Sequence, residues 1–154
     1  MKIHKLIEPE RVYLDLSASD VHSALAAVSE VLSGSLGLDP QVVTDALVER
    51  ESLGSTSVGD GFAIPHCKTQ GLRQIAIALA RYTEGIDFGG VDHEPVSFAF
   101  VVLSPTDQPA AHLQVLSQIA RVLKRRELRT ELQSAADADE VVHALCRAAE
   151  EEGL

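Results

Sequence analysis

Residues 50–66 read RESLGSTSVGDGFAIPH, and the rest of the chain is organised around this stretch. It begins where a helix is expected to end and crosses a loop that contains Gly54, Gly59 and Gly61. Glycines let a backbone adopt positive φ and approach a ligand closely, and successive free amides in such a loop can form a nest for an anion. The stretch closes on an apolar run followed by His66. The pattern indicates an anion site with an imidazole beside it; the alternative is a surface loop with a structural histidine.

The composition narrows the classes of function. The chain has 154 residues, 45% of them apolar, which predicts one folded domain over residues 1–154. A formal charge of −10 argues against nucleic acid or an anionic membrane as the main partner. No apolar run reaches the ~20 residues that a membrane helix needs, and the N-terminus has no signal-peptide core. Cys67 and Cys146 give no disulfide framework, so the cytoplasm is the expected compartment.

Two helices are predicted ahead of the loop. Ser19 or Asp20 can cap the first, whose apolar residues recur at helical spacing until residues 33–35. The Asp-Pro pair at residues 39–40 suits the start of the second. Before both helices, the alternation over residues 12–16 predicts a short strand or a strap along the surface.

Arg50 falls at the end of the second helix, on the stripe that faces inward. One interpretation pairs it with Glu51 or Asp45. The other brings its guanidinium to the anion site of the loop, where a planar fork can donate two hydrogen bonds to one phosphate.

Two apolar runs follow the loop, a continuous one over residues 75–80 and one over residues 96–103 that is interrupted only by Ser97. Both predict interior strands covered on two faces, and residues 81–86 are expected to leave the first of them. Strands preceded and followed by helices predict an α/β sandwich around one sheet, whose strand order the pattern does not give.

A long helix is predicted after these strands, with Pro109 near its first position. It carries His112 in its first turns and a basic run at residues 124–126 toward its C-terminal end. A last amphipathic helix is predicted over residues 139–151, and the acidic tail at residues 150–152 is expected to fray.

The histidines and the loop together suit phosphoryl transfer. Neutral imidazole carries a free lone pair, so His66 can accept a phosphoryl group. Such transfer demands in-line placement and donors around three equatorial oxygens. Arg50 can offset developing charge, and His112, at a helix N-terminus, tends to stay neutral and can donate to a phosphoryl oxygen. The hydroxyls of residues 55–57 and the amides near Gly59 and Gly61 are further candidates to hold oxygens.

Two other groups suggest different chemistry. Cys67 follows His66 and would be a thiol nucleophile or a redox site, but an extended backbone points its side chain away from the imidazole. His143 and Cys146 share one helix face, yet two ligands do not make a zinc site. No metal or other cofactor is expected.

The run Arg-Glu, then Gly-Ser-Thr, then Gly-x-Gly-x-Ala-Ile-Pro-His resembles the active-site signature of enzyme IIA domains of the bacterial phosphotransferase system, in the fructose/mannitol and nitrogen-regulatory branch. Ser57 departs from it, since many members have glycine there. The resemblance covers residues 5–150 and includes a second matching motif at residues 111–116. It implies a mixed sheet of about five strands with helices on both faces, as one type-2 enzyme IIA domain.

The resemblance also implies roles. It implies that His66 carries a phosphoryl group on Nε2, taken from a small histidine phosphocarrier protein (HPr-like or NPr-like). His112 and Arg50 support that group, and Thr56 is carried over with them. The protein is then a phosphohistidine carrier, a phosphotransferase component rather than a classical turnover enzyme.

Three functions stay open at this point. The sequence of residues 53–56, and of residues 86–88 followed by Asp92, resembles nitrogen-regulatory members more than sugar-specific ones. Nitrogen-regulatory members signal through phosphorylation-dependent binding of target proteins. A sugar-specific component would instead pass the group to a IIB domain for fructose or mannitol uptake. A third possibility is a binding module of the same fold that is not phosphorylated.

Overall fold

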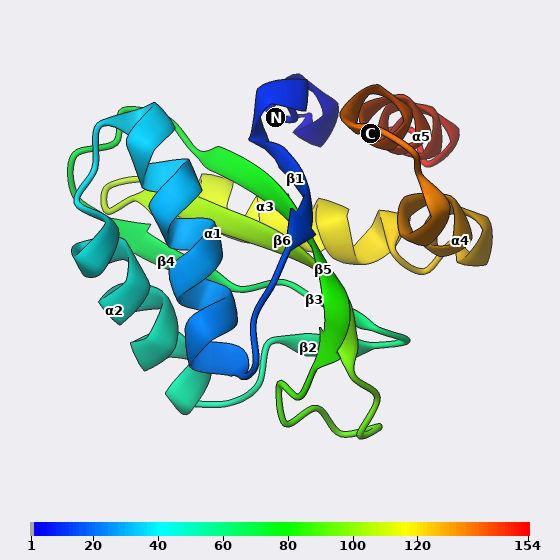
Figure 1. The fold of residues 1–154 in the computed structure, drawn as a ribbon. Helices are drawn as coiled ribbons and strands as arrows, with labels where there is room; N and C mark the ends of the chain where they lie inside the picture. The colour runs from blue at the N-terminus through cyan, green and yellow to red at the C-terminus, as the bar shows by residue number, and fades with distance from the viewer. Residues whose placement is uncertain (1) are drawn as a thin grey trace.

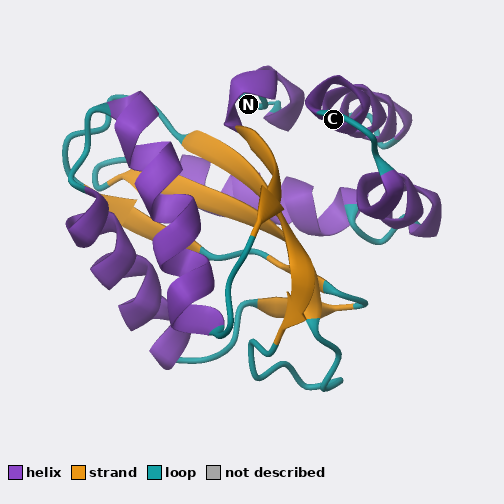
Figure 2. Ribbon diagram, in the orientation of Figure 1, coloured by secondary structure: helices purple, strands orange, loops and turns teal. Residues whose placement is uncertain are grey.

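The computed structural model describes residues 2–154, and within them one mixed sheet lies between two layers of helices (Figures 1 and 2). The strands pair in the order β1-β5-β6-β3-β2, and β4 also pairs with β6. Their bounds are Val12–Leu16 (β1), Ser57–Gly59 (β2), Phe62–Ala63 (β3), His66–Thr69 (β4), Ala76–Ile86 (β5) and Val96–Pro105 (β6). The predicted α/β sandwich is confirmed, with six strands in the described residues against about five expected.

Helices cover both faces of the sheet, as Figure 1 shows. The bounds are Val21–Leu36 (α1), Pro40–Ser52 (α2), Pro109–Val122 (α3), Arg126–Ser134 (α4) and Ala138–Glu151 (α5), with short 3₁₀ turns at Ile3–Lys5 (η1) and Pro9–Arg11 (η2). One layer is made by α1 and α2, and the other by α3, α4 and α5. The two ends of the chain lie side by side, where η1 and η2 contact α5.

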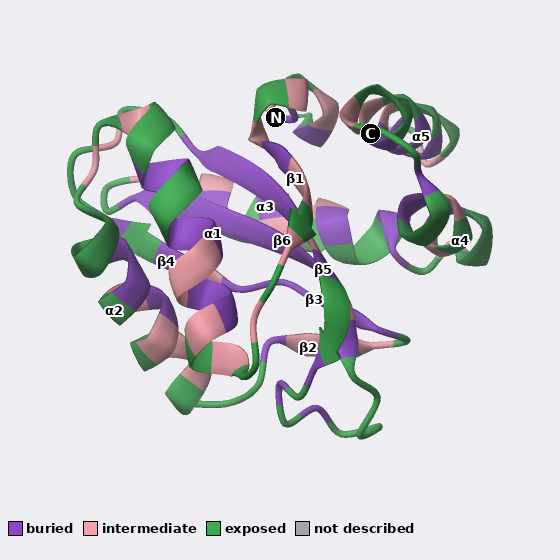
Figure 3. Ribbon diagram, in the orientation of Figure 1, coloured by how far each residue is buried: buried purple, intermediate pink, exposed green. Residues whose placement is uncertain are grey.

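The two central strands are buried along most of their length (Figure 3), and they separate two hydrophobic cores that lie under different layers of helices. Successive side chains of a strand point to opposite faces. In β6, Phe98 and Phe100 therefore face α3, α4 and α5, whereas Ala99 faces α1 and α2. In β5, Ala78 and Ala80 face the same way as Ala99. These alanines let α1 and α2 pack close to the sheet, and the aromatic side fills the space under the other helices.

Two predicted ends are wrong. The first helix continues past residues 33–35 to Leu36, because the left-handed C-cap is Gly37 (φ 69°), whose amide donates to the Ser33 carbonyl. The strand β5 does not end at residue 80 but continues to Ile86. It does so because β1 and β6 hold it from both sides, with Leu16 opposite Tyr82 and Val96 opposite Ile86.

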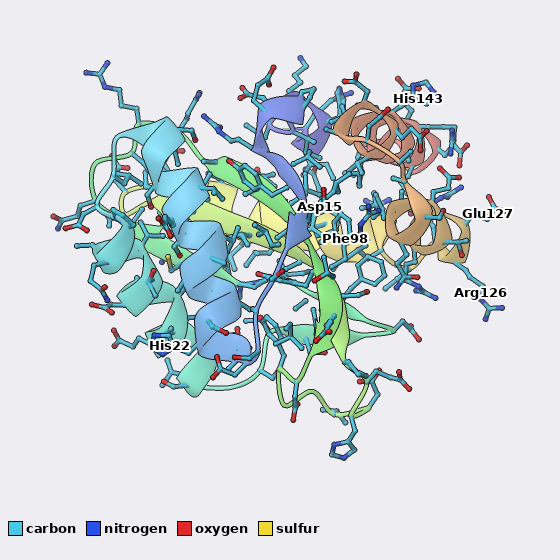
Figure 4. The ribbon with its side chains drawn as sticks, in the orientation of Figure 1. Asp15, His22, Phe98, Arg126, Glu127 and His143 are labelled. Carbon is cyan, nitrogen blue, oxygen red and sulfur yellow. The ribbon has the colours of Figure 1, made fainter. Side chains whose placement is uncertain are left out.

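The segment after α3 also differs from the prediction. The basic run at residues 124–126 lies beyond the end of α3 and leads into a separate helix, α4. Arg81 of β5 ties this helix to the sheet by donating to the Ala135 carbonyl at 2.8 Å and to two carbonyls at the end of α4. In Figure 4, Phe98 lies inside, between the sheet and α4, while Arg126 projects outward. The acidic tail is held, because Glu152 accepts from Arg125 at 2.8 Å.

The β5–β6 connection packs against the loop that leads to His66. Asp92 accepts a hydrogen bond from the Asp60 amide at 3.0 Å. A Cβ on Gly90 would lie 2.5 Å from Oγ and 2.8 Å from Cβ of Ser57. Rotation of the serine cannot relieve a clash that includes its Cβ, so a glycine is required here by close approach. Within residues 2–154, no helix is both long and apolar enough to cross a bilayer.

Gly90→Ala should lower the free energy of unfolding by about 1–3 kcal/mol, since the added methyl group overpacks the contact with Ser57. Ser57→Gly in the same chain removes both clashing atoms and should recover most of that loss. Urea denaturation of the two single variants and the double variant measures the coupling. Strictly additive effects would show that the two residues do not meet.

Candidate functional site

His66 is the first residue of β4, which runs parallel to the central strand β6. The Pro65 carbonyl accepts from the Val102 amide at 2.9 Å, and His66 lies opposite Val102. Val102 faces the α3 layer, so the imidazole is directed to that side. Cys67 faces the α1–α2 core, as the alternation of an extended chain requires.

His112 occupies the first turn of α3, beside the imidazole of His66. The two ring centroids are 5.5 Å apart and the rings are tilted by 54°. His112 is only 6% exposed, and its Nδ1 lies 2.5 Å from Oγ of Ser104 at the end of β6. The two histidines, which are distant in sequence, are therefore brought together at one end of the same central strand.

The C-terminal end of α2 brings Arg50 to the same place. Its Nη1 donates to the Gly54 carbonyl at 2.8 Å. Neither carboxylate expected as a partner pairs with it within the described residues, since Glu51 binds Thr56 and Asp45 accepts from Gln41.

A cavity of about 430 Å³ opens between α2, β4 and α3. Its lining residues are Ala46, Glu49, Arg50, Leu53, His66, Cys67, Lys68 and His112. Two cations and two imidazoles against one carboxylate make this lining suitable for a small anion. A larger hollow of about 520 Å³ between α4 and α5 has mainly carboxylates among its charged groups, which would repel a phosphate.

The loop amides do not form the predicted nest around His66. The Thr56 amide donates to Glu51 at 2.7 Å, and the Asp60 amide donates to Asp92. The Gly59 amide lies 3.4 Å from Oγ of Ser57. No residue of 55–61 lines the cavity. These groups shape the loop, and the expectation that they hold phosphoryl oxygens is not supported by their placement.

Thr56 is held by Glu51 rather than directed at the cavity. Both its amide and its hydroxyl donate to the Glu51 carboxylate at 2.7 Å, and the side chain is buried. These two hydrogen bonds to one carboxylate close the turn after α2. The Thr56 carbonyl in turn accepts from the Ile64 amide at 3.0 Å, which connects the turn to the segment that carries His66.

The hydrogen bonding of His66 fixes its tautomer. Nδ1 lies 2.7 Å from the Ile64 carbonyl oxygen, which can only accept. Nδ1 therefore carries the proton of the neutral ring, and Nε2 keeps its lone pair. Burial lowers the pKa of His66 below its ordinary value and nearby Arg50 acts in the same direction, while the hydrogen bond to Ile64 opposes them. In the neutral ring, the nitrogen with the free lone pair is therefore Nε2.

The pKa of His112 is also lowered, first by burial and then by the neighbouring His66 and Lys68. Cys67 differs in kind, because burial raises the pKa of its thiol to about 12. A thiol with that pKa is not a thiolate at neutral pH, which opposes a nucleophilic role. Among residues 2–154, no three His, Cys, Asp or Glu side chains are grouped to hold a metal ion.

Sequence reasoning missed Lys68 and Ser104, and it considered Glu51 only as a partner of Arg50, whereas Glu51 binds Thr56. Ser104 had a signal, since it is a hydroxyl that directly follows the apolar run over residues 98–103. Such a buried hydroxyl needs a hydrogen-bond partner. The role of Glu51 also had a signal in the sequence, because a carboxylate at a helix end can accept hydrogen bonds from the turn that follows the helix.

Both histidines should titrate below the ordinary value of about 6.5. Unfolding restores that value, so between the folded and unfolded pKa values the unfolded chain binds more protons. The free energy of unfolding should therefore fall as pH decreases through this window. NMR titration of the ring protons measures the two pKa values. The double variant His66→Gln/His112→Gln should have a shallower pH dependence, and folded pKa values above 6.5 would contradict the burial account.

Thr56→Val should lower the free energy of unfolding by about 1 kcal/mol, because the bond from its hydroxyl to Glu51 is lost. Thr56→Ser keeps the hydroxyl and is the matched control. Chemical denaturation compares the two. If Thr56→Val is as stable as the wild type, the contact with Glu51 does not hold the turn.

Comparison with known proteins agrees with this geometry. Residues 5–147 match the family model described as phosphoenolpyruvate-dependent sugar phosphotransferase system, EIIA 2. A nitrogen regulatory protein of Bradyrhizobium diazoefficiens is 34% identical over 145 residues, which cover 94% of this chain and 95% of that protein. A fructose-specific EIIABC component of Bacillus subtilis is 31% identical over 92% of this chain, which spans only 22% of that protein's length.

A solved structure shows the same fold. The crystal structure of nitrogen regulatory protein IIA-Ntr from Neisseria meningitidis superposes with a TM-score of 0.87 at 31% identity, over 93% of this chain and 98% of that one. The match to the relative and the structural superposition each cover more than nine-tenths of the chain. The chain belongs to the EIIA 2 family of the phosphoenolpyruvate-dependent sugar phosphotransferase system.

Proposed function

We propose that this protein accepts a phosphoryl group on Nε2 of His66 from a histidine phosphocarrier protein, and that the phosphorylated form signals by changing which proteins it binds. The observation that carries the proposal is the bond from Nδ1 of His66 to the Ile64 carbonyl. It leaves Nε2 as the only nitrogen with a lone pair. A neutral ring with a fixed lone pair is ready to attack phosphorus.

The neighbouring groups suit the charge that phosphoryl transfer develops. Arg50 and Lys68 line the cavity with His66, and both are cations that can offset charge on the equatorial oxygens. His112 also lines the cavity, and a ring N–H of this histidine can donate a hydrogen bond. Thr56 acts indirectly in this proposal, by holding the turn that supports the Ile64 segment.

The surroundings of the cavity fit a protein partner. Leu53 lies on its rim and is 81% exposed, and Leu113, next to His112, is exposed as well. Exposed apolar side chains beside a site favour protein docking. The acidic chain, at −10, disfavours nucleic acid as that partner. We expect the protein to work in the cytoplasm, where a phosphorylated carrier is available.

The regulatory role is preferred to sugar transport. The chain matches the Bradyrhizobium nitrogen regulatory protein over almost its whole length. A new phosphoryl group would add negative charge at the exposed mouth of a cationic cavity, which changes the surface that a partner meets. The alternative is transfer to a IIB domain during fructose or mannitol uptake, and the similarity to a fructose-specific EIIABC component supports it.

Incubation with a phosphorylated histidine phosphocarrier, followed by mass measurement, tests the acceptor. Wild type should gain one phosphoryl group and His66→Ala none, while His143→Ala, at an exposed histidine, should behave as wild type. Arg50→Ala should slow transfer on the order of a hundredfold, and Arg50→Lys less, since charge is kept but the fork is lost. Label on His66→Ala, or none on wild type, would refute the assignment.

The phosphorylated protein then distinguishes the two roles. Mixed with a purified IIB domain of the fructose or mannitol type, a sugar-specific component would lose its phosphoryl group to that domain. A regulator should keep it, and at least one target protein should bind only one of the two forms. Equal binding of both forms by every target would remove the switching role.

A further inference from the structure

Ser104 is a polar residue near the end of the central strand, directly after the apolar run over residues 98–103. It lies in the run of buried residues 98–105, and it is 0% exposed. Its Oγ lies 2.5 Å from Nδ1 of His112. Among residues 2–154, this is the only hydrogen bond of that hydroxyl. The register with β4 places Ser104 opposite Lys68, one of the residues that line the cavity.

The direction of this hydrogen bond can be inferred from the burial of the serine. A hydroxyl has one proton to donate, and a ring nitrogen of neutral histidine either donates or accepts. If His112 donated from Nδ1, the serine proton would have no acceptor in a place that water does not reach, which is costly. If Ser104 donates, both groups are satisfied. The proton of His112 then lies on Nε2.

We propose that Ser104 is a positioning residue that holds His112 in its Nε2–H tautomer, so that His112 presents a donor to the cavity. The Ile64 carbonyl imposes the opposite tautomer on His66, in which Nδ1 carries the proton and Nε2 carries the lone pair. Two imidazoles with centroids 5.5 Å apart thus have complementary roles, one nucleophile and one donor. The tautomers follow from the contacts, whereas their use in transfer rests on the proposed function.

The tautomers fit phosphoryl transfer without any proton movement. The bond from phosphorus to Nε2 of His66 forms as the bond to the nitrogen of the carrier's phosphohistidine breaks, and that electron pair stays on the carrier. The proton of His66 stays on Nδ1, which continues to donate a hydrogen bond to the Ile64 carbonyl. His112 donates from Nε2 to a phosphoryl oxygen and keeps its proton. With the other tautomer, His112 would direct a lone pair at an oxygen anion.

Nitrogen-15 NMR of the unphosphorylated protein tests the assignment, at about pH 8, where histidine is neutral. Long-range proton–nitrogen correlations distinguish the two tautomers of each ring. His66 should carry its proton on Nδ1 and His112 on Nε2. Ser104→Thr and Ser104→Val give side chains of the same shape with and without the hydroxyl. The threonine variant should keep the tautomer of His112, and the valine variant should lose the preference.

Transfer rates from the phosphorylated carrier complete the test. Ser104→Val should be slower than Ser104→Thr by about tenfold, the effect expected for one hydrogen bond. If the valine variant does not fold, Ser104→Ala replaces it. A proton on Nδ1 of His112 in the wild type would overturn the proposal, as would an unchanged tautomer in the valine variant. Correct tautomers with equal rates would refute only the role in transfer, and a wild type that is never phosphorylated would refute the proposed function.

Discussion

The hydrogen bond from Nδ1 of His66 to the Ile64 carbonyl is the contact on which the site depends. It needs the backbone of residues 64–66 to be held still, and two neighbours do this. The Ile64 amide donates to Thr56, and the Pro65 carbonyl accepts from Val102. Proline at position 65 limits the backbone further, because its φ is fixed by its ring. The chemistry at Nε2 is therefore set by backbone contacts that side-chain changes elsewhere do not easily disturb.

The strand β6 serves both imidazoles, and this explains why it must be rigid. Its Val102 lies opposite His66 of β4. Near its end, Ser104 forms a hydrogen bond with His112. One face of β6, with Phe98 and Phe100, packs under α3, whose first turn holds His112. The other face, with Ala99, Val101 and Leu103, shares a core with α1 and α2, and the end of α2 holds Arg50. A buried strand covered on two faces is a rigid support, so it can hold the relative positions of the two imidazoles and the guanidinium to within a fraction of an ångström.

The layered fold was predictable because its signals are local and strong. The apolar runs that became β5 and β6, and the Asp-Pro start of α2, depend on neighbours in sequence. The missed helix α4 is different, since Arg81 of a distant strand satisfies its last carbonyls. The meeting of His66 with His112 was suggested by family resemblance, and periodicity alone could not supply it. The engagement of Thr56 by Glu51 depends on a turn geometry that the glycines and hydroxyls of the loop leave open.

The most direct test of the account is the identity of the nitrogen that carries phosphorus. Selective nitrogen-15 labelling of histidine, with NMR of the phosphorylated protein, reveals this through the coupling between phosphorus and nitrogen. The account predicts coupling to Nε2 of His66, with Nδ1 still protonated and hydrogen-bonded to the Ile64 carbonyl. Coupling to Nδ1 would mean that this hydrogen bond is broken before transfer, and would contradict the central claim.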